Sequence, residues 1–264
     1  MTNLSFYSDY YEQPRLWGGQ TVSSQEEDRI QQTLSLIPEE CCSILEVGCG
    51  DGRIINRLVW RYGKVCGLDV STEALRHVMA ERILGSIDSL PFSDKSFDLV
   101  ICCEVLEHLP FKVYPKALKE LQRVTATYII VSVPNRENVK QSLITCPQCG
   151  CAFHPSRHLR SFQKRTMLNL FTSFSLQVSG FCGPSTKAYP YFVVRAAKFL
   201  KLIPNPNLSP YALCPQCGYT PSGDDSTSSG KGNSILRFLL PLARRLIPAK
   251  KVPLWLLALY HQKS

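Results

Sequence analysis

A glycine-rich turn between two short apolar segments is the first feature of this chain that could do chemistry. The stretch Ile44–Gly52 reads Ile-Leu-Glu-Val-Gly-Cys-Gly-Asp-Gly, and Asp69 lies seventeen residues further on, at the end of the second apolar segment. Glycines let a backbone approach a ligand closely, and a carboxylate at the tip of the next strand accepts hydrogen bonds from ribose hydroxyls. This spacing predicts a nucleotide-type cofactor site at one edge of an open α/β sheet.

Two carboxylates beside the turn indicate which cofactor it binds. A dinucleotide fingerprint has the form G-x-G-x-x-G and directs a helix N-terminus at a pyrophosphate. Here the pattern is Glu46-x-Gly48-x-Gly50-x-Gly52, and Asp51 adds a second acidic side chain. These carboxylates would repel a pyrophosphate, but they suit a cofactor that carries a sulfonium and an ammonium group. The sequence therefore predicts S-adenosylmethionine (SAM) as the cofactor.

A third acidic position, Asp88, extends this site. We expect it at the end of a third strand, where its carboxylate can accept a hydrogen bond from the adenine amino group. A turn, a fourth strand and Glu104 at the exit of that strand follow. The expected cofactor-binding residues are Glu46, Gly48, Cys49, Gly50, Gly52, Asp69, Val70, Asp88, Ser89 and Glu104.

Four motifs in this order resemble those of the class I methyltransferases, in particular the type 11 branch that includes ubiquinone-pathway enzymes. They read EVGCGDG, GLDVS, DSLPFSDKSFDLV and EVLEHL, and the resemblance is close over residues 40–135 and looser elsewhere. It implies an α/β fold, with a Rossmann-like seven-stranded sheet and helices on both faces, and methyl transfer from SAM. It also implies an aromatic N-terminal cap, in which Tyr10, Tyr11 and Trp17 would cover the cofactor. Packing of a terminal helix on the sheet explains these aromatic residues equally well.

Two copies of the sequence Cys-Pro-Gln-Cys-Gly, 68 residues apart, form a second strong pattern. A C-x-x-C turn brings two sulfurs close together, and two such turns make a tetrahedral zinc site of the ribbon type. Four thiolates leave no open position for a substrate, so we expect a structural role. Two redox dithiols or unpaired cysteines are the alternatives, and Cys151 and His154 rank lower as ligands. The predicted zinc ligands are Cys146, Cys149, Cys214 and Cys217.

Three residues are candidates for acting on the methyl acceptor, where a protein aligns the nucleophile and supplies a base if a proton must leave. Glu104 occupies the family position near the catalytic pocket. His158 and Arg160 stand where related enzymes carry a His-x-Arg motif, so His158 is the predicted base and Arg160 would hold a phosphate or carboxylate. Alternatively, His158 caps a helix and Arg160 pairs with a surface acid. We expect Glu107 and His108 to pack on a helical turn.

Regular elements must hold these residues at one edge of the sheet. Apolar runs predict strands and helical spacing predicts helices, in alternation. The predicted strands are one that ends at Asp69, one that ends at Asp88, Ser43–Val47, Phe97–Cys103, Thr127–Val133, Ser175–Phe181 and Val252–His261. The predicted helices are Glu26–Ile37, Arg53–Tyr62, Thr72–Leu84, one that starts at Glu104–His108, Tyr114–Val124, Gln163–Phe171 and Ile235–Ile247.

The elements group into four segments of a chain of 264 residues, long enough to bury a sizeable core. Residues 1–40 form the cap segment and 41–135 the SAM-binding core. Residues 136–220 form a substrate-side half with the zinc-ribbon insertion. Residues 221–264 contain a polar linker, an amphipathic helix and a closing strand.

The net charge of +9 is unevenly distributed along the chain. Residues 1–134 carry 13 Lys and Arg against 18 Asp and Glu, whereas residues 135–264 carry 17 against three. The basic half predicts an anionic acceptor or surface as the partner, and the basic, apolar stretch 235–260 predicts a peripheral membrane contact. Solubilising charges and core packing explain these two features equally well.

The N-terminal pattern, the longest apolar run and the cysteine count indicate the cellular compartment. The N-terminus lacks the charged-then-apolar pattern of a signal peptide, and the longest apolar run, Leu254–Tyr260, is far shorter than the roughly 20 residues that span a bilayer. Twelve cysteines in a chain of this size indicate reduced thiols and a metal site. We therefore expect a cytoplasmic protein, with or without peripheral membrane contact.

The leading interpretation is a SAM-dependent methyltransferase that acts on a small-molecule, sugar-linked or lipid-linked acceptor. An RNA methyltransferase that uses the basic zinc-ribbon half is an alternative. Nucleic acid is favoured less as a partner, because Cys103–Leu106 replaces the N-P-P-Y type of loop after the fourth strand. A non-catalytic SAM-fold interaction protein is the third interpretation. The sequence leaves the oligomeric state open.

Overall fold

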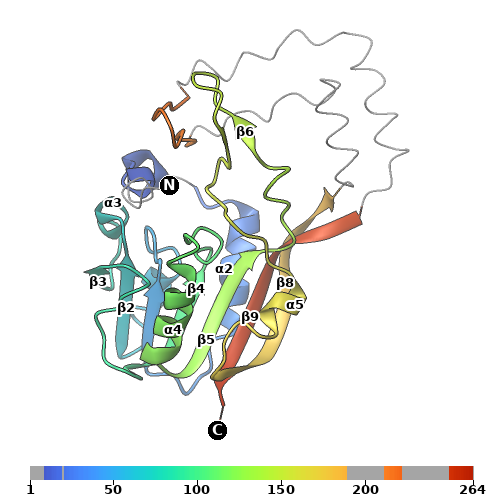
Figure 1. The fold of residues 1–264 in the computed structure, drawn as a ribbon. Coiled ribbons are helices and arrows are strands. Elements are labelled where there is room, and N and C mark those ends of the chain that lie inside the picture. The colour runs from blue at the N-terminus through green and yellow to red at the C-terminus, as the bar shows by residue number, and fades with distance from the viewer. Residues whose placement is uncertain (1–8, 20, 189–210, 222–249, 264) are drawn as a thin grey trace. The chain divides into compact units, whose positions relative to one another are not determined.

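A seven-stranded sheet in the order β3-β2-β1-β4-β5-β9-β8 organises the chain (Figure 1). The structure is a computed structural model that describes residues 9–19, 21–188, 211–221 and 250–263. Neighbouring strands from β3 to β5 pair in parallel, and β9 is antiparallel to β5. The strands are β1 (Ser43–Val47), β2 (Lys64–Asp69), β3 (Glu81–Leu84), β4 (Phe97–Cys103), β5 (Thr125–Pro134), β8 (Phe174–Ala188) and β9 (Lys250–Gln262).

The strand order reverses between β1 and β4, and again at the edge of the sheet where β9 lies between β5 and β8. The chain builds outward from β1 to β3 and then returns to place β4 on the other side of β1. In open α/β sheets the connections on the two sides of such a point diverge, which leaves a crevice at the carboxyl ends of the strands. The segments that follow β1 and β4 therefore frame the expected ligand site.

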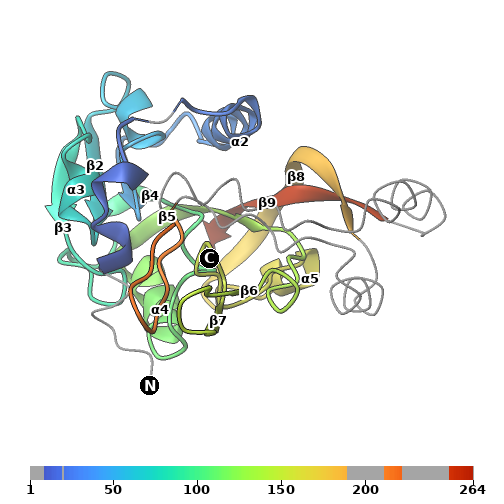
Figure 2. The same cartoon turned by 90° about the horizontal axis from the view of Figure 1, so that it is seen from above.

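Buried side chains on strand β4 alternate between the two faces of the sheet. Leu99 and Ile101 belong to one apolar cluster, and Val100 belongs to the other. Helix α2 (Ser24–Ser35) packs into the first cluster and helix α4 (Tyr114–Val124) packs into the second, so the two helices cover opposite faces (Figure 2). The predicted arrangement of helices on both faces is confirmed.

The remaining elements are short. Ser23 caps helix α2 by accepting a hydrogen bond from the Glu26 N–H group (3.2 Å), as expected for a helix that begins after a serine. The others are the 3-10 turns η1 (Pro14–Leu16) and η2 (Ile55–Arg57), the helices α3 (Thr72–Leu75) and α5 (Lys164–Met167), and a hairpin of β6 (Ile144–Thr145) and β7 (Ala152–Phe153).

Two predicted helices are wrong. The segment 53–62 forms only η2 and turns, in which Arg57 N and Leu58 N bond to carbonyl groups three residues earlier. The helix predicted over 72–84 ends with α3, because Asn56 bonds His77 O and Met79 N and the chain then pairs with β2 as β3.

Three further predictions differ at their boundaries. The helix predicted to start at Glu104–His108 is a turn, in which Glu104 adopts a φ of +56°, and α4 begins only at Tyr114. Helix α5 covers four residues of the predicted 163–171. Strand β3 ends at Leu84, before Asp88. The predicted helix 235–247 lies outside the described residues.

The chain divides into two compact units, which are described separately. The sheet unit comprises Met1–Glu137, Leu159–Pro184 and Pro253–Ser264, and the cysteine unit comprises Asn138–His158 and Ser185–Val252. Within the described ranges, no helix combines the length and the apolar character that crossing a bilayer requires.

Asp98 fixes the start of β1 against β4. Its Oδ2 atom accepts hydrogen bonds from Cys42 N (2.9 Å), Ser43 N (2.9 Å) and Ser43 Oγ (2.8 Å), and Ser43 Oγ accepts one from Asp98 N (2.9 Å). Partial burial opposes ionisation of this carboxyl group, but these donors hold the pKa of Asp98 below its usual value. The ionised carboxylate therefore stabilises the register of the two central strands.

The substitution Asp98→Asn should lower the free energy of unfolding by about 2 kcal/mol at pH 7, because hydrogen bonds to a charged acceptor are replaced by weaker ones. Because the pKa of Asp98 is lower in the folded state than in the unfolded state, its contribution is present above the unfolded pKa and is lost as pH falls through the folded pKa. Urea unfolding at pH 7 and in acid measures both effects. The control Asp94→Asn, at a largely exposed carboxylate, should change stability by less than about 0.5 kcal/mol. A pH-independent deficit would contradict this assignment.

Candidate functional site

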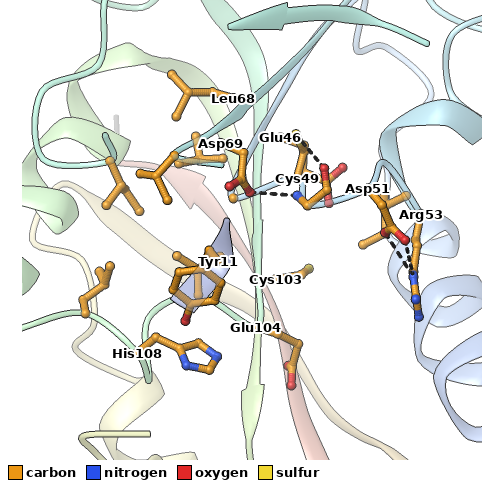
Figure 3. A pocket seen from close by; sticks show the side chains of 18 of the residues that line it. Tyr11, Glu46, Cys49, Asp51, Arg53, Leu68, Asp69, Cys103, Glu104 and His108 are labelled. Carbon is orange, nitrogen blue, oxygen red and sulfur yellow. Dashed lines mark hydrogen bonds and ion pairs between the residues drawn. The ribbon is translucent and has the colours of Figure 1, made fainter. Parts of the chain in front are cut away.

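A pocket of about 560 Å³ lies in the sheet unit at the carboxyl ends of β1, β2 and β4 (Figure 3). Glycines and carboxylates form one side of it, and aromatic and apolar side chains form the other. Its lining comprises Tyr11, Trp17, Glu26, Arg29, Glu46, Val47, Gly48, Cys49, Gly50, Asp51, Arg53, Ile54, Leu68, Asp69, Val70, Gly85, Ser86, Ile87, Cys103, Glu104, Val105, His108, Leu109, Pro110 and Val113.

The glycine turn after β1 bends back over β2. The N–H groups of Gly48 and Cys49 both donate to Leu68 O, at 2.7 and 3.1 Å. Gly48 has a φ of +74°, and a Cβ atom there would lie 2.3 Å from Val105 Cγ2. Glycine is therefore required at this position both by the backbone conformation and by the close approach of the segment after β4.

Asp69 closes the turn from the tip of β2. Its carboxylate accepts the N–H groups of Gly50 (2.8 Å) and Ser71 (3.0 Å). Burial raises the pKa of Asp69, although these two donors act in the opposite direction. An ionised carboxylate has about four acceptor positions, so two remain for a ligand hydroxyl. This geometry suits the role in ribose binding that the sequence predicts.

Glu46 is buried beneath the turn and lines the pocket. It accepts the Ile55 N–H group, and burial raises the pKa of its carboxyl group to about 8. Asp51, the other acidic residue of the motif, instead pairs with Arg53 at 3.1 Å. A bound cation would therefore change the charge of Glu46 more than the charge of Asp51.

Arg29, on helix α2, is a pocket residue that the sequence analysis did not single out. It is 7% exposed, its guanidinium lies 5.6 Å from the Trp255 ring, and Nη1 donates to Ser132 Oγ at 3.4 Å. Burial opposes its charge, but the neighbouring Glu104 carboxylate raises its pKa. Apart from Glu26, which lies 3.8 Å away on the same helix, the partners Ser132, Trp255 and Glu104 are distant in sequence, so no local pattern indicated that Arg29 lines the pocket.

Glu104 is held by two side chains from the neighbouring strands. Ser132 Oγ donates to Oε1 (2.9 Å), and Trp255 Nε1 donates to Oε2 (2.8 Å). Each carboxylate oxygen thus has a hydrogen-bond donor, and Arg29 provides a nearby positive charge. These contacts fix the position of the Glu104 carboxylate at the edge of the pocket.

The N-terminal segment reaches the pocket as the resemblance implied. Trp17 and Tyr11 both line it, and Trp17 Nε1 donates to Tyr11 O at 2.6 Å. Ser71 Oγ donates to the same carbonyl at 2.8 Å, which ties the segment to the end of β2. Tyr10 is buried behind Tyr11 and is not part of the lining.

His108 lies at the apolar end of the pocket. Its ring is in edge contact with Tyr11, with centroids 6.0 Å apart, and Nε2 lies 3.7 Å from Glu107 Oε1 (Figure 3). Glu107 is 1% exposed, and burial together with the charge of Glu104 raises its pKa well above the usual value. His108 thus lies beside a buried carboxyl group at the edge of the pocket. From the sequence, packing was the favoured role of these two residues, and direct chemistry was the less favoured one.

The structure brings seven of the ten expected cofactor-binding residues to the pocket lining. Gly52 lies in the turn, where its missing side chain leaves room for Asn56. Asp88 and Ser89 follow β3 in a turn, with Asp88 bonded to Ser86 Oγ, and Ser86 and its neighbours line the pocket instead. The seven are Glu46, Gly48, Cys49, Gly50, Asp69, Val70 and Glu104.

Arg160 belongs to the sheet unit and lies outside the pocket lining. Its guanidinium lies 4.1 Å from the Tyr114 ring centroid and 5.5 Å from that of Phe111, and Nη1 donates to Leu106 O at 2.6 Å. These contacts hold the segment between β4 and α4 in place. His158, the other predicted acceptor-side residue, belongs to the cysteine unit.

The cysteine unit contains the four predicted metal ligands in one cluster. All four Sγ atoms lie within 4.8 Å of one another, with Cys146–Cys217 at 3.6 Å and Cys149–Cys214 at 3.5 Å. Tetrahedral coordination with Zn–S bonds of about 2.3 Å requires sulfur separations of about 3.8 Å. The donor set therefore fits a zinc ion.

The two knuckles share one backbone pattern. Gly150 and Gly218 have φ values of +74° and +70°, and each donates its N–H group to the carbonyl of the first cysteine at 3.0 Å. Cys146 N bonds Cys151 O (2.8 Å), and Cys214 N bonds Tyr219 O (2.9 Å). Each glycine thus allows the turn that presents two sulfurs on one side.

The substitution Gly48→Ala should destabilise the protein by roughly 2–4 kcal/mol, because it adds a positive-φ penalty and a clash with Val105. Thermal unfolding of Gly48→Ala, Val105→Ala and the double variant forms a double-mutant cycle. The double variant should recover part of the loss, because removing the Val105 methyl groups relieves the clash but not the backbone strain. Additive losses would show that the predicted contact is absent.

Comparisons with known proteins agree with this geometry. Residues 45–127 match a family described as a methyltransferase domain. The malonyl-[acyl-carrier protein] O-methyltransferase of Erwinia pyrifoliae is 37% identical over 95 residues, which cover 33% of this chain and 35% of that protein. A ubiquinone biosynthesis O-methyltransferase of Albidiferax ferrireducens is 28% identical over 93 residues, 31% of this chain and 37% of that protein. The matched part of the chain thus spans just over a third of the length of these relatives.

Solved structures show the same fold. An N-methyltransferase from Bradyrhizobium japonicum, in complex with S-adenosyl-L-homocysteine, aligns with 97% of this chain and 99% of its own. The TM-score is 0.54 at 13% identity, so the likeness concerns the fold. The predicted Rossmann-like methyltransferase sheet is confirmed. The family match ends at residue 127 and does not include either cysteine knuckle.

Proposed function

We propose that this protein is a SAM-dependent methyltransferase. The observation that carries the proposal is the pocket at the reversal of the strand order between β1 and β4, where a glycine turn lies between the buried carboxylates of Glu46 and Asp69. The match of residues 45–127 to a methyltransferase domain supports it. The O-methyltransferase names of the relatives support an oxygen as the accepting atom.

The polar and charged groups of the pocket match the parts of SAM. When bound, SAM supplies an electrophilic methyl group on its sulfonium. Asp69 suits the ribose hydroxyls, and Ser86 and Ile87 lie where the adenine is expected. Glu46 and Arg29 offer one negative and one positive group, which suits the zwitterionic amino-acid end of the cofactor. Cys49 and Val70 remain candidate contacts, and Ser86 and Ile87 line the pocket in place of the predicted Asp88.

On the acceptor side, His108 is the pocket residue best suited to take a proton, with the Glu104 carboxylate held nearby. A neutral imidazole has the pKa range that general-base catalysis requires near pH 7. His158 remains a second candidate base. Arg160 is a positioning residue for the pocket wall through its contacts with Leu106 and Tyr114.

We infer a small-molecule, sugar-linked or lipid-linked acceptor that carries negative charge. The names of the two relatives include a carrier-protein-linked acid and a quinone pathway, both of which belong to this range. The basic half of the chain supports an anionic acceptor and contact with an anionic membrane surface through 235–260. We further propose that the four cysteines bind a structural zinc ion, because their separations fit a tetrahedral thiolate site.

Calorimetric titration with SAM and with S-adenosylhomocysteine tests the function. We expect micromolar binding of both, and we expect Asp69→Asn to weaken it at least about tenfold, which corresponds to ~1.4 kcal/mol. Asp88→Asn is the matched control, because Asp88 lies outside the pocket lining and should change the affinity by less than about threefold. No binding by folded protein would favour a non-catalytic interaction protein, and equal losses would place Asp88 in the site.

The pKa of Glu46 predicts proton release on cofactor binding. Near pH 7 its carboxyl group is mostly protonated, because its pKa is about 8, and an adjacent ammonium group would lower that pKa. Cofactor affinity should therefore rise with pH up to about 8, with a fraction of a proton released per cofactor at pH 7.

Calorimetry in two buffers of different ionisation enthalpy measures this proton release. The Glu46→Gln variant should lose this proton release. Because the cofactor's own amino group titrates equally in both proteins, the difference in proton release between them reports on Glu46 alone. The same release in the variant would exclude Glu46 as its source.

A further inference from the structure

The turn that contains His158 has an ordered hydrogen-bond arrangement within the cysteine unit. The N–H groups of Ser156 and His158 both donate to His154 Nδ1, each at 3.2 Å. His154 is 6% exposed, and its ring stacks on His158 with centroids 4.6 Å apart and an interplanar angle of 17°. Two backbone donors thus fix the His154 ring, and this ring orients the His158 ring that stacks on it.

This turn is attached to the first cysteine knuckle by the chain itself. The hairpin strand β7 leaves that knuckle and leads directly into His154. Phe153, at the end of β7, is 5% exposed and packs in a small apolar cluster with Ile144 and the metal-ligand candidates Cys146 and Cys214. The position of the turn thus follows the position of the first knuckle.

Arg157 attaches the same turn to the second knuckle. It is 6% exposed, adopts a φ of +65°, and donates from Nη2 to Leu213 O, the carbonyl next to Cys214. Its guanidinium also lies 6.0 Å from the Phe153 ring centroid. A buried arginine in a left-handed backbone conformation persists only where its surroundings over-determine it. The second knuckle provides that constraint.

The small cluster alone is a weak link between the two knuckles. Among the described residues, its buried members are Ile144, Cys146, Phe153, Ala212 and Cys214. A core of this size does not hold together segments more than 50 residues apart, whereas a tetrathiolate zinc site contributes its binding free energy directly to folding. A bound metal would therefore fix Leu213 O beneath Arg157.

We infer that a metal ion bound by the four cysteines holds His158 in position. Arg157 and the stacked His154 connect the metal-bound knuckles to His158. The inference rests on the proposed zinc site and does not depend on cofactor binding, because every contact lies within the cysteine unit. Arg157 is accordingly a positioning residue. In the methyltransferase proposed above, loss of the metal would release the candidate base His158 while the pocket of the sheet unit still binds cofactor.

Nuclear magnetic resonance of full-length protein with 13C-labelled histidine tests this inference. The chain has five histidines, so each Cε1–Hε1 signal can be assigned by one His→Gln variant. In zinc-loaded protein, we expect stacking to shift the His154 and His158 signals away from free-histidine positions. Removal of zinc by a chelator should move both signals to those positions, while the His77 and His261 signals and the affinity for S-adenosylhomocysteine stay unchanged.

Substitution of Arg157 separates positioning from metal binding. Arg157→Gln should shift the His154 and His158 signals with one zinc still bound per chain, and Arg157→Lys should restore part of the change. Lys140→Gln, at an exposed cation of the same unit, is the matched control and should shift neither signal. Unchanged histidine signals after zinc removal, or in Arg157→Gln, would overturn the inference. So would ordered His154 and His158 signals in protein that binds no zinc; failure to bind S-adenosylhomocysteine would instead overturn only the methyltransferase proposal.

Discussion

The close approach of the segments that follow β1 and β4 is the constraint on which the rest of the sheet unit depends. Gly48 leaves no room for a side chain beside Val105, and its N–H group is bonded to Leu68 O on β2. The turn is thereby drawn over β2 and toward Asp69, which takes the N–H group of Gly50. The same turn brings the Glu46 carboxylate to the Ile55 N–H group. The turn and the pocket beside it therefore depend on one glycine contact.

The charges buried around this pocket explain why it suits a ligand with charges of both signs. Burying an ionised group is costly unless it is paired or hydrogen-bonded. Hydrogen bonds from Ser132 and Trp255 and the nearby charge of Arg29 offset the cost of burying Glu104. Glu46 has one backbone donor, and burial raises its pKa. A ligand that brings an ammonium group to Glu46 and a carboxylate to Arg29 would complete both environments. Hydrogen bonds therefore hold the Glu104 side of the pocket in place before a ligand binds, whereas the charge of Glu46 changes when a ligand binds. This division suits reversible cofactor exchange.

The parts that could be predicted from the sequence are those fixed by local chemistry. β1 and β4 were predicted to the residue, because buried parallel strands are continuous apolar runs bounded by turns. The cysteine knuckles were predicted because each C-x-x-C-G turn closes on itself. The errors occur where side chains that are distant in the sequence determine the local structure. Asn56 bonds His77 O and Met79 N, so the predicted helix ends early and its last residues form an edge strand. Arg29 was missed for the same reason, since Ser132 and Trp255 lie more than 100 residues away.

The division into two units also reorganises the charge of the chain. The sheet unit carries 18 basic and 19 acidic residues, and the cysteine unit carries 12 basic and two acidic residues. The sheet unit is therefore nearly neutral, with a net charge of −1, and the cysteine unit carries a net charge of +10. Four thiolates with one zinc ion would lower the charge of the cysteine unit by about two and leave it strongly positive. In the methyltransferase proposed above, the nearly neutral unit with its own pocket suits a zwitterionic cofactor, and the basic unit would raise the local concentration of an anionic acceptor. Because salt would screen that attraction but not the buried contacts of Glu46 and Asp69, acceptor capture would depend more strongly on ionic strength than cofactor binding.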